Sequence, residues 1–307
     1  MPDADKTKTD DDVLNGYLDY WDKTIEKWLA GSSSDPLHGC GDDPFLRNVR
    51  RFVQPDLMPE PYWGDPTNCS IVIANLNPGR GNDFDRLHPG NAHEESVVWL
   101  EKLVREKKSY RAVAESFPLL LADDELEKEL GPGEKLHDYG GRHWWRYQSG
   151  RIQWAEYMWH RVAKEHKTPF RPFAMELCGW HSSGWNQGPS NAVAANGVLF
   201  RKLVLRPLIE AVKRSDVRLG LCCGADWSRI LRDKRFQSDI RPVTEHETIA
   251  CDNRRRENTR FKRKYSLFEI DKDNHIVVTS EGPGNPTPHW SSWPRMIDWL
   301  RGNGVIS

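Results

Sequence analysis

The hydrophobic residues of this chain follow two spacings, one typical of amphipathic helices and the other of buried strands. Apolar residues that recur every three or four positions predict helices, and short continuous apolar runs rich in β-branched residues predict buried strands. Helical spacing is found over residues 10–29, 93–106, 152–166, 190–213 and 227–232, and in a final segment from residue 292. Strand-like runs are found over residues 71–74, 173–178, 218–223, 265–270 and 275–279.

The predicted strands and helices alternate along the chain, which favours parallel strands joined by helical crossovers. The last two strands flank the turn-rich segment 271–274, and we expect them to form a hairpin. We therefore predict an α/β fold with three layers, α/β/α, in which a central, mainly parallel sheet of four to five strands lies between layers of helices.

The domain organisation follows from where this alternation begins. Residues 1–56 carry one long predicted helix and a single helical turn near 45–52, and we expect them to form an N-terminal helical extension. Residues 57–307 are predicted to form one α/β domain. The weakly periodic stretch 109–151 is interpreted as an insertion into this domain, placed as a lid over the sheet. The helix over 190–213 is expected to be kinked at Pro207.

The charge and hydrophobicity of the sequence limit the kinds of partner that we expect the chain to bind. The 307 residues include 44 Lys and Arg against 45 Asp and Glu, a formal charge of −1, so any attraction for nucleic acid must be local. No apolar run approaches the roughly 20 residues of a membrane span. The acidic, polar N-terminus is unlike a signal or transit peptide. We expect a soluble, cytoplasmic monomer with no membrane partner.

The six cysteines show no Cys-x-x-Cys pair and no regular spacing, which argues against a zinc site, an iron–sulfur site or a disulfide framework. Four of them lie in or beside apolar runs, where a thiol usually acts as a small buried hydrophobe. No pair of histidines has the spacing of a helical metal site, and Gly79-x-Gly81 lacks the rest of a dinucleotide fingerprint. We predict no metal and no cofactor.

Two polar loops stand out because each follows a predicted strand and precedes a helix. The first runs from Asn75 to Asn82, and the second from Ser280 to Trp290. In an open α/β sheet, ligands bind beyond the carboxyl ends of the strands, where amides and glycines let the backbone approach a ligand closely. The alternative is that Asn-Pro-Gly serves only as a turn. His181, which follows the strand 173–178, is interpreted as capping its loop, because no nucleophile motif surrounds it.

These two loops resemble those of the uracil-DNA glycosylase superfamily. That family places one polar loop after its first strand and another after its last strand. The mismatch-specific uracil/thymine branch has Asn-Pro-Gly in the first loop, matched here by residues 77–79. The family's second loop reads His-Pro-Ser-Pro or Asn-Pro-Ser-Gly, and residues 285–288, Asn-Pro-Thr-Pro, are similar. The lead-in Pro-Tyr-Trp-Gly-Asp-Pro at 61–66 and the strand–helix order over about 57–302 also fit.

The resemblance implies removal of a base from DNA after its nucleotide is flipped out of the duplex. Asn77 matches the amide that positions the attacking water, and Asn285 matches the group that hydrogen-bonds the base carbonyl and stabilises the anion on the leaving base. These two are the implied catalytic residues. Phe84 would stack on the base, Glu176 aligns with a base-reading amide, and His289 or Trp290 would fill the vacated stack. The implied substrate-binding residues are Pro78, Gly79, Phe84, Glu176, Thr287, His289 and Trp290.

The chain departs from the family at both implied catalytic positions. The branch with the strongest catalysis has an acid in the first loop and a histidine in the last, where this chain has Asn77 and Asn285. At position 176 an ionised carboxylate would only accept hydrogen bonds, unlike an amide.

A basic segment lies shortly before the predicted hairpin. It concentrates seven cations that could bind phosphates, or that could belong to a solvated loop. These are Arg254, Arg255, Arg256, Arg260, Lys262, Arg263 and Lys264.

Three functional hypotheses follow. The first is a hydrolase of N-glycosidic bonds in DNA, working without metal. The second is an inactive nucleic-acid or nucleotide-binding module on the same fold. The third is an α/β enzyme that acts on a small metabolite and does not bind DNA.

Overall fold

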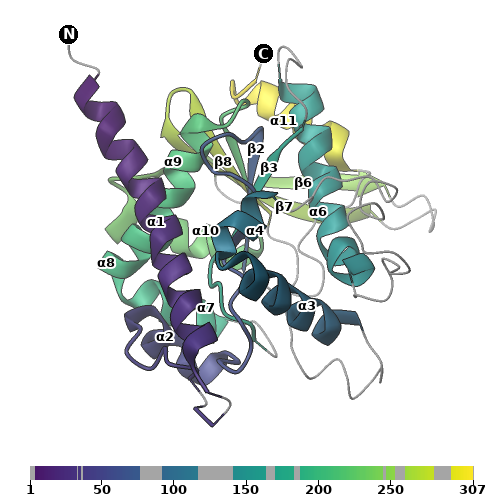
Figure 1. Cartoon of the computed structure of the whole chain (residues 1–307). Coiled ribbons are helices and arrows are strands. Elements are labelled where there is room, and N and C mark those ends of the chain that lie inside the picture. Colours follow the sequence, from purple (N-terminus) through teal and green to yellow (C-terminus); the bar gives the residue numbers. More distant parts are fainter. Residues whose placement is uncertain are drawn as a thin grey trace.

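The computed structural model describes residues 4–32, 34–35, 37–76, 92–116, 141–163, 170–182, 187–244, 247–252, 260–279 and 292–306 (Figure 1). Within these ranges the chain forms one mixed sheet with helices on both of its faces.

Eight strands of the described chain form the sheet. They are β1 (Tyr62–Trp63), β2 (Ile71–Asn75), β3 (Pro172–Glu176), β4 (Leu219–Cys223), β5 (Arg241–Pro242), β6 (Glu247–Asp252), β7 (Arg260–Asp271) and β8 (Asn274–Thr279). Their order is β1-β3-β2-β4-β8-β7-β5, and β6 pairs with β7. The four central strands β3, β2, β4 and β8 are parallel, and the outer ones are antiparallel. The α/β class and the hairpin are confirmed, but the sheet has more strands than the four to five predicted.

The helices occupy most of the connections between these strands. They are α1 (Ala4–Ala30), α2 (Pro44–Val49), α3 (Ala92–Lys107), α4 (Tyr110–Ser116), α6 (Gly141–Val162), α7 (Gln187–Ala195), α8 (Gly197–Phe200), α9 (Arg206–Arg214), α10 (Ala225–Leu231) and α11 (Trp293–Gly302). Helix α9 contacts β2, β4 and β8 and carries α1 on its outer side, whereas α6 contacts β2 and β3 and lies beside α3 and α11 (Figure 1).

Helix α1 is part of the main core. Its buried residues recur at helical spacing, as the sequence predicts, and they belong to the same hydrophobic cluster as the sheet. They include Leu14, Tyr17, Leu18, Trp21, Ile25 and Trp28. The Tyr17 hydroxyl donates a hydrogen bond of 3.1 Å to the Pro61 carbonyl, which ties α1 to the segment that leads into β1.

Two predicted elements differ from the structure in their bounds. The single kinked helix expected over 190–213 is divided, because the Asn196 side chain accepts a hydrogen bond from Leu199 N and starts α8. A short π-helix, Arg201–Leu205, then precedes α9, which has Pro207 in its first turn. The helix predicted from residue 152 begins at Gly141.

The stretch interpreted as an insertion over 109–151 has described elements at both ends. Helix α4 contributes Tyr110, Val113 and Ala114 to the core, and Ala114 O accepts a hydrogen bond of 3.0 Å from Gly64 N. The acidic middle of this stretch, residues 117–140, lies outside the described residues.

Aromatic and sulfur side chains fill the interior. Trp154, Trp180 and Trp227 are fully buried. Five cysteines have described side chains, Cys40, Cys69, Cys178, Cys222 and Cys223, and all five are buried and free of disulfides. Burial raises the pKa of the Cys69 and Cys222 thiols. Within the described ranges, no helix combines the length and apolar character that a membrane span requires.

Candidate functional site

The carboxyl ends of the parallel strands line up in one row across the sheet. Asn75 of β2 pairs with Glu176 of β3, and each is the last residue of its strand. Farther along the row, Cys223 ends β4 opposite Thr279, which ends β8 and pairs with Tyr265 of β7. Because this edge is where α/β sheets bind ligands, the polar groups along it define the candidate site.

An amide and a carboxyl group form the centre of the site. Asn75 Nδ2 donates a hydrogen bond of 2.9 Å to Glu176 Oε1, and both side chains are buried. The Asn75 carbonyl accepts a hydrogen bond of 3.0 Å from Trp227 Nε1, which holds the end of β2 in place. Asn75 Oδ1 and Glu176 Oε2 are buried but have no hydrogen-bond partner among the described residues. Two buried oxygens without a partner on adjacent residues are suited to binding a ligand with polar groups.

Three further ionisable groups surround this pair. Arg151 of α6 is buried, and its charge acts on Glu176. Glu60 precedes β1, and its Oε1 lies 3.2 Å from Nε2 of His181, which follows β3. Both members of that pair are buried. A hydrogen bond of 2.8 Å from Glu60 N to Gly179 O fixes their two segments side by side.

Burial determines the charge state of Glu176. The pKa of this carboxyl group is raised to about 8, mainly because burial desolvates it, with a smaller contribution from the nearby Glu60, whereas the charge of Arg151 and the hydrogen bond from Asn75 oppose the shift. At neutral pH the group is therefore mostly protonated. A neutral carboxyl group has one O–H donor and also accepts hydrogen bonds, as an amide does, so the departure at position 176 is smaller than the sequence suggests.

The two polar loops begin next to each other. The described part of the first loop ends at Leu76, the second loop follows Thr279, and Gly224, which follows β4, lies between these two residues. Gly224 N donates a hydrogen bond of 3.0 Å to Thr279 O. A Cβ atom on Gly224 would lie 2.7 Å from Leu76 Cδ1, so the glycine permits this close approach. With φ of 117°, Gly224 also adopts a backbone conformation that few other residues tolerate.

The basic segment lies partly on strands that extend beyond this row. Strand β8 ends at Thr279, opposite Tyr265, but β7 begins five positions earlier at Arg260 and there pairs only with β6. At about 3.4 Å per residue, the β6–β7 ribbon extends roughly 17 Å past the edge that carries the site. It runs to the right in Figure 1. Strand β7 includes Lys262, Arg263 and Lys264, and the Lys264 side chain is exposed.

Several predicted site residues lie outside the described residues, including both implied catalytic amides. They are Asn77, Pro78, Gly79, Phe84, Arg254, Arg255, Arg256, Asn285, Thr287, His289 and Trp290. The structure describes Glu176, and it describes the strands from which the two loops depart.

Sequence reasoning missed most of the partners of Glu176. The sequence places Asn75 only at the start of the first loop, and it does not place Arg151 or Glu60 in the site. Glu60 has a weak signal, because it is a charged residue between two prolines next to the lead-in motif. His181, which the sequence places in the loop after β3, is fully buried and lies close to Glu60.

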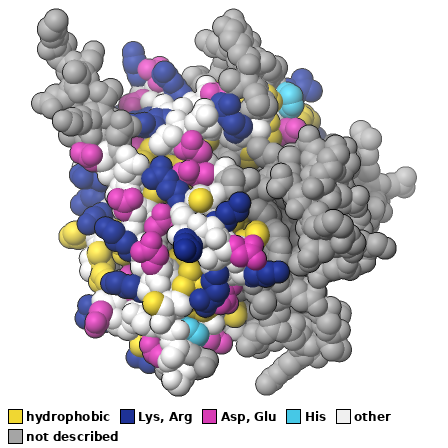
Figure 2. Space-filling model, in the orientation of Figure 1, with side chains coloured by type: hydrophobic (Ala, Val, Ile, Leu, Met, Phe, Trp, Pro, Cys, Tyr) yellow, Lys and Arg dark blue, Asp and Glu magenta, His cyan; other side chains and the backbone are white. Residues whose placement is uncertain are grey.

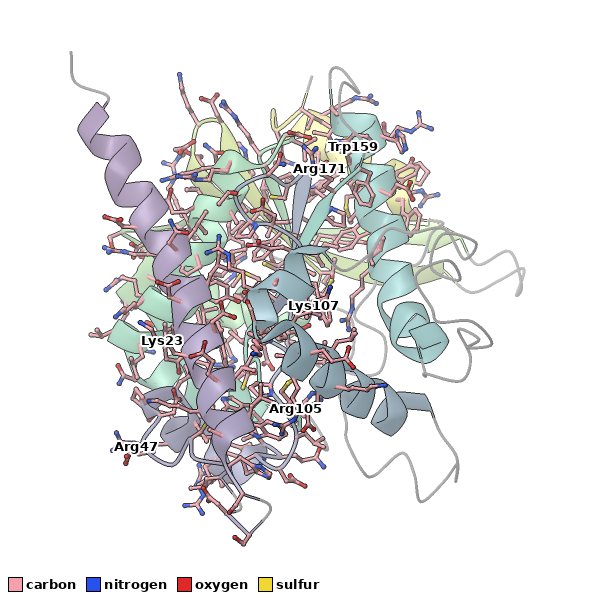
Figure 3. All side chains as sticks on the ribbon, viewed as in Figure 1. Lys23, Arg47, Arg105, Lys107, Trp159 and Arg171 are labelled. Atoms are coloured by element: carbon pink, nitrogen blue, oxygen red, sulfur yellow. The ribbon has the colours of Figure 1, made fainter. Side chains whose placement is uncertain are left out.

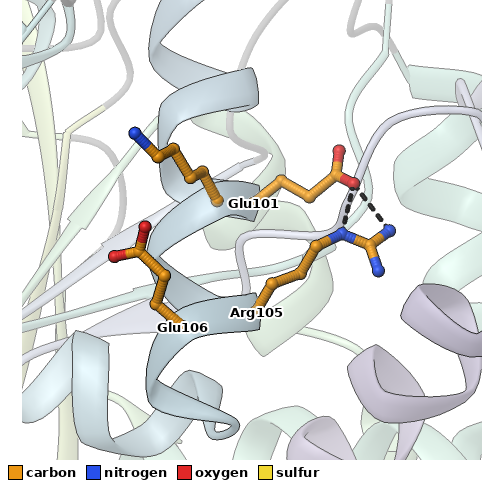
Figure 4. A pocket seen from close by; sticks show the side chains of 4 residues that line it. Glu101, Arg105 and Glu106 are labelled. Atoms are coloured by element: carbon orange, nitrogen blue, oxygen red, sulfur yellow. Dashed lines mark hydrogen bonds and ion pairs between the residues drawn. The ribbon is translucent and has the colours of Figure 1, made fainter.

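Three surface hollows of the described chain lie away from these strand ends. One on α3 is lined by two acidic and two basic residues, Glu101, Lys102, Arg105 and Glu106, and Arg105 forms an ion pair of 2.7 Å with Glu101 (Figure 4). Basic and acidic side chains are intermixed on the face seen in Figure 2, as the formal charge of −1 leads one to expect. Among the described residues, no group of three or more His, Cys, Asp or Glu side chains is placed to hold a metal ion.

Comparison of the chain with protein-family models, with curated proteins and with solved structures gives no match.

Proposed function

We propose that this protein is a uracil-DNA glycosylase-like hydrolase that cleaves N-glycosidic bonds in DNA after the target nucleotide is flipped out of the duplex. In this proposal the helices on the two faces of the sheet form the three layers of the glycosylase fold. The proposal combines the loop motifs at 77–79 and 285–288 with the arrangement of the strands that carry them.

The convergence of the two loop origins is the observation that carries the proposal. The first and last parallel strands along the chain, β2 and β8, lie on either side of β4 and end at the same edge. Leu76 and Thr279 are both in contact with Gly224, so the loops that follow them start from neighbouring points. A fold that began these loops at opposite edges could not place Asn77 and Asn285 around one base.

The Asn75–Glu176 pair suits recognition of the base. Uracil and thymine present an N3–H donor next to the O4 acceptor, and cytosine presents an acceptor next to an amino donor. A protonated Glu176 Oε2 would donate to O4, while Asn75 Oδ1 would accept from N3–H. This combination favours uracil or thymine over cytosine.

The roles of the remaining groups follow the chemistry of base release. Asn77 would orient a water toward the sugar carbon as positive charge develops there. Asn285 would donate a hydrogen bond to the base carbonyl as negative charge develops on the base. The buried charge of Arg151, which acts on Glu176, would further stabilise an anionic base held beside that residue.

A second candidate is a nucleic-acid-binding module without base release. The observation that favours it is the basic β6–β7 ribbon, which extends past the site edge and does not depend on any catalytic residue.

The test is release of a base from labelled duplexes that each contain one uracil, one hypoxanthine or one thymine opposite guanine. Cleavage of the abasic product in alkali is scored on a gel. We expect the parent protein to release uracil and Asn77→Ala to be slower by a factor of about 100 or more, since it loses the group that orients the water. The matched control is Asn68→Ala, an exposed amide at the opposite edge of the sheet, which should act like the parent.

Two outcomes would contradict the enzymatic proposal. One is no release from any duplex by folded parent protein, and the other is equal release by the parent and Asn77→Ala. Salt-dependent DNA binding without release would support the binding module instead.

A further inference from the structure

An arginine-lined groove lies on the N-terminal part of the chain, outside the site described above. Its volume is about 630 Å³, and it is lined by Arg47, Asn48, Arg50 and Arg51. The three arginines are exposed, and no acidic residue lines the groove. They belong to α2 and to the 3₁₀ turn Arg50–Phe52 that continues it. Figure 3 labels Arg47 on this part of the surface.

The helix that carries the groove is held in place because the other face of α2 packs into the core. Phe45, Leu46 and Val49 are buried. Asp43, the acid at the start of α2, accepts hydrogen bonds of 2.6 Å from both Leu46 N and the Tyr20 hydroxyl. Its carboxylate is therefore bound by the helix and by α1 and does not pair with the three arginines, although the charge of Arg50 also acts on Asp35.

Two of the arginines are partly oriented by neutral neighbours. The Arg51 guanidinium lies over the Phe52 ring, 4.6 Å from its centre, and Arg47 Nη2 donates a hydrogen bond of 3.2 Å to the Asp42 carbonyl. A guanidinium stacked on an aromatic ring keeps its N–H edge available, and this edge matches the geometry of a phosphate group.

The groove lies on the β3 side of the candidate site. Gln54, which follows the 3₁₀ turn, donates a hydrogen bond of 2.8 Å from its backbone N to the His181 carbonyl, and His181 follows β3. The basic β6–β7 ribbon lies at the other end of the same row of strand ends. From β3 to β7 the sheet order makes four steps of about 4.8 Å, so these two strands are roughly 19 Å apart.

We propose that the groove of Arg47, Arg50 and Arg51 is a second phosphate-binding site for a nucleic acid, which holds the polynucleotide backbone on the β3 side of the strand ends while the β6–β7 ribbon contacts it on the other. This inference rests on the proposed function, and it makes a polynucleotide, rather than a free nucleoside, the ligand of the site. A nucleic acid is favoured because two separate cationic features flank one edge, and a backbone with regularly spaced phosphates can contact both.

The experiment measures binding of the full chain to a labelled, undamaged 20-base-pair duplex by fluorescence anisotropy between 50 and 200 mM NaCl. The variant replaces Arg47, Arg50 and Arg51 with Gln. Each lost phosphate contact should reduce the slope of log K against log salt by about 0.9, so we expect a decrease of about 2 to 3 and at least tenfold weaker binding at 50 mM.

The matched control removes three exposed cations at the amino edge of the sheet, with Lys213→Gln, Arg218→Gln and Lys272→Gln together. We expect it to keep the slope of the parent. Urea midpoints of all three proteins establish that they are folded. An unchanged slope in the groove variant, an equal decrease in the control, or no DNA binding by the parent would overturn the inference.

Two further arms separate this inference from its alternatives. Binding to phosphatidylserine vesicles tests whether the groove serves an anionic membrane, and binding to a poly-glutamate peptide tests whether it serves an acidic protein. If the groove variant lost binding to the vesicles or to the peptide but kept its binding to DNA, the inference would be overturned. Because undamaged DNA is used, the slope is measured whether or not base release is found. The inference can therefore fail while the proposed activity stands, and the reverse is also true.

Discussion

Glu176 shows how the position of one residue in the fold changes its chemistry. On the surface, a glutamate at the end of a strand would be ionised at neutral pH and would only accept hydrogen bonds. Here burial raises the pKa of the carboxyl group to about 8, even though the charge of Arg151 and the amide of Asn75 favour the ionised form. The residue therefore acts as a donor and acceptor at physiological pH, and it becomes acceptor-only at higher pH.

This protonation has a consequence for stability. Because the folded pKa of Glu176 is above its ordinary value of 4.5, the unfolded chain releases the proton first as the pH rises. The folded state then binds more protons than the unfolded state, so the free energy of unfolding decreases between about pH 4.5 and 8 and levels off above that. The decrease amounts to about 3 to 4 kcal/mol between pH 5 and 8.

We expect Glu176→Gln, which cannot ionise, to lack this contribution. Urea unfolding of the parent and of Glu176→Gln at pH 5 and pH 8 measures it, and the variant should gain about 3 to 4 kcal/mol relative to the parent over this interval. If the free energies of unfolding of the parent and of Glu176→Gln differed by the same amount at pH 5 and at pH 8, Glu176 would already be ionised in the folded protein at pH 5. Asn68→Ala, which removes no ionisable group and changes an exposed side chain, serves as the control and should keep the pH dependence of the parent.

At the residue scale, the sequence predicts which strand ends carry polar groups but not which groups meet. Glu176 is predictable because it directly follows an apolar run, and Asn75 because it follows another. That they hydrogen-bond to each other depends on β2 and β3 being neighbours in register, a long-range pairing that no local pattern reports. Arg151 was missed because it lies on a helix whose apolar spacing predicts a start at the next residue.

At the scale of elements, the turn from β4 into α10 holds the edge of the sheet together. Gly224 separates the last residue of β4 from the first residue of α10. Its backbone N–H donates a hydrogen bond to the Thr279 carbonyl, and its lack of a side chain leaves room for Leu76. Any side chain at this position meets both an unfavourable φ and a collision with Leu76.

We expect Gly224→Ala to lower the free energy of unfolding by at least about 2 kcal/mol, because the Cβ atom brings backbone strain and crowding together. Gly16→Ala is the matched control. Gly16 is exposed in α1 with open space around it, so alanine there should stabilise the protein by about 0.5 to 1 kcal/mol. Chemical denaturation of both variants measures these changes, and equal stability of Gly224→Ala and the parent would mean that the turn can relax.

The predictability of the elements depends on their length. The runs in β2, β3 and β4 are long enough to show continuous apolar character, and all three are found as predicted. Strands β1 and β5 have two residues each, and β5 includes a proline, so no periodicity could reveal them. Strand β7 begins at Arg260, well before the predicted residue 265, and its first five residues pair with β6 beyond the end of β8. Four of these five residues are charged, so they show no apolar run that would predict a strand.

At the scale of the molecule, the N-terminal helix shares one core with the sheet. The sequence separates residues 1–56 as an extension, since the strand–helix alternation begins after them. In the structure, the Trp21 ring lies so close to Gly179 that a Cβ on that glycine would be 2.8 Å from it. Trp21 also contacts Phe45 of α2, with the ring centres 6.0 Å apart. The helix therefore supports the segment that carries His181.

Replacing Trp21 should therefore affect the whole molecule. We expect Trp21→Ala to lower the free energy of unfolding by about 3 to 5 kcal/mol, since it leaves a large cavity between α1 and the sheet. A single cooperative transition, seen by circular dichroism and by fluorescence alike, is expected for the parent. Val198→Ala, at a side chain that is 75% exposed, should change stability by less than about 0.5 kcal/mol. A small effect of Trp21→Ala would show that α1 folds as a unit apart from the sheet.

The buried cysteines provide a way to observe motion in the unmodified protein. Cys40 lies beneath α1, Cys69 lies just before β2, and Cys222 is in the centre of the sheet. A thiol-specific reagent can reach each of them only when its surroundings open. The order in which these thiols are alkylated in native buffer would therefore rank the local opening of three regions, without any label or engineered probe.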